Sequence, residues 1–144
     1  MLFINIGMKK SDIDKKFKLK NKHFKIFVRE FNYWVNIYSI NNWEFSFNFG
    51  ADGKNDDTRA HVYRDHISRI CLVFLNDKWE GTKPTEENIR IVAYHEATEM
   101  LLSKINDLAT SRSITRDELE EAIHVVIRTL ENTHWNLDMM FRKL

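Results

Sequence analysis

Ala93-Tyr94-His95-Glu96-Ala97-Thr98-Glu99-Met100-Leu101-Leu102, residues 93–102, form two turns of an expected helix that carry most of the chemical information in this chain. At about 100° per residue, His95 and Glu99 lie about 40° apart around a helix. They share that face with apolar neighbours, so the pattern predicts that both ionisable groups lie on the stripe facing the core. Burying such groups without partners is costly, and a bound partner is therefore expected.

The residue types at these positions indicate a metal site. Imidazole and carboxylate groups are ligands of zinc and of other first-row divalent ions. A second carboxylate directly after the histidine, that of Glu96, can act as the general base for a metal-bound water. The motif has the form of a zinc-peptidase signature with glutamate in place of the second histidine. Because His-Glu-x-x-Glu also arises readily by chance, its meaning depends on the elements around it.

A second helix is predicted to begin at Thr115, where residues 115–118 have the form of a capping box, and to continue to about residue 132. Glu120 and His124, again four residues apart, lie along one edge of its apolar stripe. If this helix is antiparallel to the motif helix, expected over 85–108, the two pairs can converge. Two imidazoles and two carboxylates suit zinc and balance its charge. A hydrogen-bonded cross-link between the helices, without metal, is the alternative.

The other elements predict an α+β domain. Large apolar residues at helical spacing predict an amphipathic helix over 23–39, and strict alternation predicts a half-buried strand over 43–49. Residues 59–63 can form a short strand. The continuous apolar run from Ile70 to Leu75 fits a strand buried on both faces. We expect a loop over 76–84, a short amphipathic helix in the tail from residue 135 onward, and a single domain spanning residues 1–144.

Composition narrows the classes of function. The chain has 144 residues, 43% of them hydrophobic and 30% charged, as in an ordinary globular domain. Its net charge of +1 provides no overall field for nucleic acid, and no apolar run approaches a membrane-spanning length. The single Cys71 cannot form an intrachain disulfide, which favours a reducing, cytoplasmic compartment. The lead-in, residues 1–22, is rich in lysine, and a solvated, partly flexible segment is favoured there over a nucleic-acid contact.

Two stretches, AYHEATEMLL (93–102) and DELEEAIHVVIRTLEN (117–132), resemble small phage and prophage proteins described as metallopeptidases, which are similar in layout to minimal zincins. The resemblance covers about residues 70–132. It implies a zincin-like domain with an N-terminal helix, a small, mostly antiparallel sheet of about three strands, the motif helix and a second ligand-bearing helix. It also implies that His95 is a metal ligand, Glu96 the general base and Glu99 the second ligand. The third ligand would come from the second helix, His124 being preferred over Glu120.

These observations lead to two hypotheses of function. The first is a zinc-dependent peptidase of the host cytoplasm, in which the metal activates water for Glu96 and an extended peptide lies along an edge strand, 59–63 or 70–75. His61 and His66 are candidate substrate contacts, although a surface role is favoured for both. The second hypothesis is a catalytically inactive, zincin-like phage accessory or interaction protein, with Glu120 closing a structural metal site or with no metal. A dinuclear carboxylate site is a weaker third idea, because such sites draw ligands from four helices.

Overall fold

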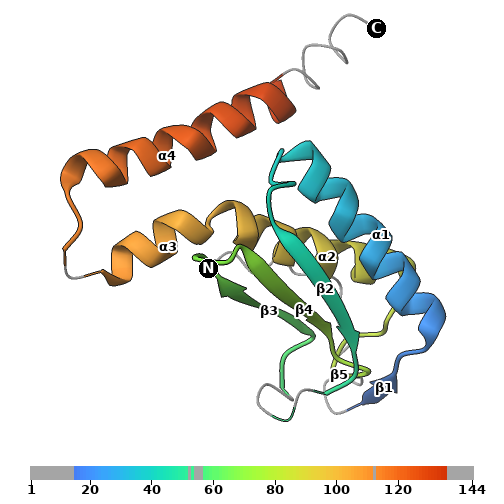
Figure 1. The fold of residues 1–144 in the computed structure, drawn as a ribbon. Coiled ribbons are helices and arrows are strands. Elements are labelled where there is room, and N and C mark those ends of the chain that lie inside the picture. The colour runs from blue at the N-terminus through green and yellow to red at the C-terminus, as the bar shows by residue number, and fades with distance from the viewer. Residues whose placement is uncertain (1–14, 52, 54–56, 112, 136–144) are drawn as a thin grey trace, which may run out of the picture.

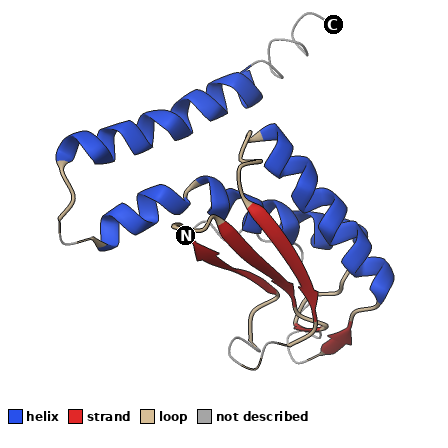
Figure 2. Ribbon diagram, in the orientation of Figure 1, coloured by secondary structure: helices blue, strands red, loops and turns tan. Residues whose placement is uncertain are grey.

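A three-stranded sheet and two helices form the body of the protein. The computed structural model describes residues 15–51, 53, 57–111 and 113–135. Strands β2 (Glu44–Phe49), β4 (Ile70–Leu75) and β3 (Ala60–Asp65) lie side by side in that order, with β2 parallel and β3 antiparallel to β4. Helices α1 (Asn21–Ile37) and α2 (Glu86–Leu101) pack together on one face of this sheet (Figures 1 and 2). The predicted α+β class is confirmed, and the pairing within this sheet is mixed.

Helix α1 anchors the core through the aromatic stripe that the sequence pattern predicts. Phe27, Phe31 and Val35 recur at four-residue intervals and are all buried. The Phe31 ring meets Phe45 and Phe47 of β2 edge-on, with centroids 5.3 and 5.4 Å apart. These rings fix the inner face of β2 against the helix, and the predicted helix over 23–39 and strand over 43–49 are both confirmed.

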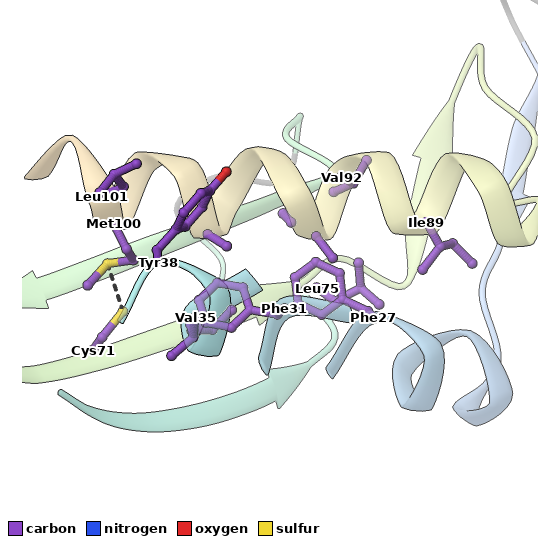
Figure 3. Packing of buried hydrophobic residues seen from close by; sticks show 14 of the residues in the cluster. Phe27, Phe31, Val35, Tyr38, Cys71, Leu75, Ile89, Val92, Met100 and Leu101 are labelled. Atoms are coloured by element: carbon purple, nitrogen blue, oxygen red, sulfur yellow. Dashed lines mark hydrogen bonds between the residues drawn. The ribbon is translucent and has the colours of Figure 1, made fainter. Parts of the chain in front are cut away.

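Helix α2 lies across the same core. It begins after Thr85, whose hydroxyl accepts a hydrogen bond from the backbone N–H of Asn88. Its buried row includes Ala93 and Ala97, and such small side chains allow a helix to approach its neighbours closely. Figure 3 shows the far end of this row, where the Cys71 thiol of β4 lies 3.5 Å from the thioether of Met100.

Strand β4 differs from its prediction. It is the central strand, and Cys71, Val73 and Leu75 are fully buried beneath the two helices. Ile70 and Leu72 on the opposite face are each 39% exposed, so the prediction of burial on both faces is wrong. The physical reason is that both α1 and α2 pack on the same side of the sheet.

Two further strands occupy segments whose sequence predicts a lead-in and a loop. Strand β1 (Lys16–Lys18) pairs antiparallel with β5 (Lys78–Glu80), placing Phe17 opposite Trp79. The ammonium group of Lys16 lies 2.9 Å from the Glu80 carboxylate. Part of the predicted 1–22 lead-in is therefore structured, whereas residues 1–14 lie outside the described part of the chain.

The C-terminal helices turn back along the molecule. The helix predicted over 85–108 is divided at Leu102 into α2 and α3 (Ser103–Thr110), and the capping box at Thr115 starts α4 (Arg116–Leu130) as predicted. Helix α4 packs against α3 (Figure 1). A π-helical turn follows over Glu131–Trp135, and the amphipathic helix predicted for the tail lies, apart from its first residue Trp135, on residues 136–144, outside the described residues. Among the described helices, none has both the length and the apolar character needed to cross a membrane.

Candidate functional site

Helix α2 places its three motif residues in two different environments. Glu96 is buried with 5% of its surface exposed, whereas the side chains of His95 and Glu99 are 67% and 47% exposed. The prediction that His95 and Glu99 lie on the core-facing stripe is therefore wrong. The face that turns inward is centred on Ala93 and Ala97, because their small side chains fit between α1 and the sheet, and Glu96 is carried inward with them.

His95 and Glu99 form a pair of adjacent donors on the outer surface of α2. The His95 Nε2 atom lies 3.2 Å from Glu99 Oε1. In a tetrahedral zinc site with metal–ligand distances of about 2.0–2.1 Å, two ligand atoms lie about 3.3 Å apart. The spacing of this pair therefore matches two ligands of one zinc ion, and it equally matches an ordinary ion pair across one helical turn.

The Glu96 carboxyl group is the least satisfied polar group described in the fold. Its Oε2 atom is buried and has no hydrogen-bond partner among the described residues. Burial, and to a lesser extent the neighbouring Glu99 carboxylate, raise the pKa of Glu96 to about 8, and the Arg64 guanidinium opposes both effects. In the absence of a bound cation, Glu96 is therefore mostly protonated at neutral pH.

A cleft of about 540 Å³ lies beside α2 and receives all three motif residues. One wall consists of Ile91, Val92, His95, Glu96 and Glu99 from α2. The opposite wall comes from residues 57–61, which lead into β3, and from residues 78–80 of β5. This volume lies within the range typical of small-ligand sites, about 300–1,000 Å³. The cleft is thus large enough for a small molecule or a short piece of peptide.

The second predicted pair lies elsewhere. Glu120 and His124 are exposed on α4, and neither lines the cleft. The Glu120 carboxylate accepts a 2.7 Å hydrogen bond from Arg116, and His124 Nδ1 lies 2.8 Å from the backbone oxygen of Glu120. The predicted convergence of the two pairs is absent from the described arrangement, because α3 lies between α2 and α4 in the chain and α4 packs against α3.

The described residues supply only part of a metal centre. Within residues 15–51, 53, 57–111 and 113–135, no group of three or more His, Cys, Asp or Glu side chains is placed to hold a metal ion. His95 and Glu99 provide two donors, whereas a catalytic zinc ion uses three protein ligands and a water. The chemistry of these two ligands fits zinc, but their number is one short of the three protein ligands of a catalytic zinc site.

Several cleft residues were missed by the sequence analysis. Trp79 and Arg59 line the wall opposite α2, and the isolated tryptophan in a predicted loop was the available signal for the first. His61, named from the sequence as a candidate substrate contact with a surface role favoured, lines the cleft and stacks on Phe74 at 4.8 Å. His66 does not line it and instead pairs with Asp107 of α3.

Comparison of the chain with protein-family models, with curated proteins and with solved structures finds no match.

Proposed function

We propose that this protein is a metal-dependent hydrolase that cleaves peptides in the cleft beside α2, with Glu96 as its general base. The observation that carries the proposal is the Glu96 carboxyl group, which is buried, lines the cleft and has an oxygen without a described hydrogen-bond partner. Leaving such a group unpaired costs free energy, and uncompensated groups of this kind concentrate at functional sites. A water molecule in the cleft would donate a hydrogen bond to this oxygen.

His95 and Glu99 would hold the metal at the mouth of the same cleft. Their donor atoms are 3.2 Å apart, and their exposed positions leave them accessible from solvent. A bound divalent ion would polarise a carbonyl group and acidify a water molecule. Glu96, adjacent to His95 in the chain, is then the carboxylate placed to accept a proton from an attacking water and to return it to the leaving amine.

The strand β3 would guide the substrate. In the described part of the chain, β3 lies at an edge of the three-stranded sheet and β4 lies at its centre, so of the two candidate edges only β3 remains. Residues 57–61 lead into this strand and line the cleft. An extended peptide can add to a strand edge through main-chain hydrogen bonds. Such a peptide would pass in front of α2.

Replacement of Glu96 with glutamine tests the proposal. With zinc or another first-row ion supplied, we expect the unaltered chain to cleave members of a fluorogenic peptide mixture and Glu96→Gln to lose this activity while retaining metal binding. Glu87→Gln is a matched control, because Glu87 is an exposed glutamate in the first turn of the same helix. Equal cleavage by the wild-type and Glu96→Gln chains would refute the role of Glu96.

A second candidate function is a non-catalytic interaction protein that retains the cleft for binding. The observation that favours it is the incomplete donor set, since only two ligands of the motif meet in the described arrangement. On this hypothesis Glu96→Gln leaves the biological activity unchanged, whereas bulky substitutions in the cleft abolish partner binding. Glu96→Gln and the bulky cleft substitutions together therefore separate the two functions.

A further inference from the structure

Arg59 forms a fixed cationic group on the wall of the cleft opposite α2. Its Nη2 group donates a 2.6 Å hydrogen bond to the hydroxyl of Thr82. Its Cζ atom lies 5.9 Å from the ring centroid of Trp79, within the range of a cation–π contact. Both supporting side chains are buried, so the guanidinium group rests on packed side chains of the folded chain. An arginine held in this way loses less conformational entropy when it binds a ligand.

The backbone of Arg59 is held as firmly as its side chain. Its carbonyl oxygen accepts a 2.9 Å hydrogen bond from the backbone N–H of Asn76 and a 3.2 Å hydrogen bond from the indole of Trp79. Neither interaction uses the Arg59 side chain. Truncation of this side chain should therefore leave the cleft wall in place, which makes Arg59 suitable for mutagenesis.

The charge of Arg59 is not neutralised by a described carboxylate. Arg29, Arg90 and Arg116 each lie within 4.0 Å of a glutamate oxygen. Among the residues that the structure describes, Arg59 makes no such ion pair, although it lines a cleft that also contains glutamates. A guanidinium group has five N–H donors, and the hydrogen bond to Thr82 uses one. The remaining donors suit a planar, bidentate anion such as a carboxylate.

We propose that Arg59 anchors a carboxylate of the ligand, and that the ligand is a short peptide with a free C-terminus. The second part of this inference, that the ligand is a peptide, rests on the proposed function. It applies to the same site because Arg59 and Glu96 line one cleft of about 540 Å³. A terminal carboxylate belongs to the peptide backbone, so its distance from a given peptide bond is nearly constant. An anchor on one wall would thus select which carbonyl group reaches Glu96 on the other.

The test measures binding without turnover, in the full-length Glu96→Gln chain, by calorimetry at low salt. Three probes are compared: acetyl-trialanine with a free carboxylate, the same peptide as its amide, and an amidated analogue with a central glutamate. We expect the free acid to bind at least about tenfold more tightly than the amide. Arg59→Ala should reduce the free acid to the affinity of the amide, and Arg59→Lys should retain part of the difference.

Arg128→Ala is the matched control, since Arg128 is an exposed cation of α4 whose removal changes the net charge equally. Tight binding of the glutamate analogue would show that Arg59 binds a side-chain carboxylate of the ligand. The role of Arg59 as anchor would stand, and the free C-terminus would not be required. Equal binding of acid and amide, or no binding of any peptide at millimolar concentration, would overturn it. If wild-type protein hydrolyses peptides and Arg59→Ala does so equally well, the anchor fails and the proposed function stands. If carboxylates bind through Arg59 and no peptide is cleaved, the anchor stands and the proposed function fails.

Discussion

The buried carboxyl group of Glu96 should make the metal-free fold less stable as the pH rises. The pKa of this group is about 8 in the folded chain, against 4.5 for a glutamate exposed to solvent, and burial is the first cause. The folded state therefore binds a proton more strongly than the unfolded state. The contribution of Glu96 to the free energy of unfolding is fully present below about pH 4.5 and falls progressively until the pH passes about 8. At about 1.4 kcal/mol per pH unit, the loss at pH 7 is on the order of 3 kcal/mol.

Urea unfolding followed by tryptophan fluorescence between pH 5 and pH 9, with a chelator present, measures this effect. The relevant quantity is the slope of the free energy of unfolding against pH, because glutamine at this position adds a constant offset and does not titrate. We expect Glu96→Gln to remove most of the downward slope and Glu87→Gln to retain it. The reasoning is refuted if the wild-type and Glu96→Gln chains show the same dependence on pH.

Further predictions concern the core, the helix ends and the metal. Burial raises the pKa of Cys71 to about 12, so the native thiol should resist iodoacetamide at pH 8 and react at the rate of a free thiol only in denaturant, as mass spectrometry can follow. Phe31→Ala should lower the free energy of unfolding by about 3–5 kcal/mol in urea titrations, because its ring is fully buried. Thr115→Ala removes the side-chain half of a capping box, the hydroxyl that accepts from the Glu118 N–H, and should cost α4 about 1 kcal/mol, seen as faster amide exchange confined to its first turn. His95→Ala should weaken zinc binding in equilibrium dialysis by at least about tenfold, whereas His124→Ala should leave it unchanged; a loss on both substitutions would show that α4 does supply a ligand.

Local patterns predicted the elements whose signals lie within a single segment. The aromatic stripe of α1, the alternation of β2 and the capping box at Thr115 depend on neighbours a few residues away, and all three were predicted correctly. The burial of β4 could not be predicted, since its apolar run does not reveal that both helices pack on one side of the sheet. The division at Leu102 carries no glycine or proline signal.

The candidate site divides in the same way. The His95–Glu99 pair and the adjacent Glu96 follow from helical geometry alone, and α2 carries them to one cleft. Which of these residues is buried depends on a small rotation of the helix, set by the fit of Ala93 and Ala97 against α1 and the sheet. The location of His124 depends on the whole path of the chain through α3, which no short-range pattern encodes.

The pairing of β1 with β5 has a consequence for how the cleft is assembled. Phe17 and Trp79 are about sixty residues apart in the chain, and each strand contains three residues. A long closed loop secured by so short a ladder is expected to form after the local elements and to open before them. The wall made by β5 should therefore exchange its amide protons faster than the wall made by α2. Access to the interior of the cleft would then be governed by the N-terminal segment, far in sequence from the motif on α2.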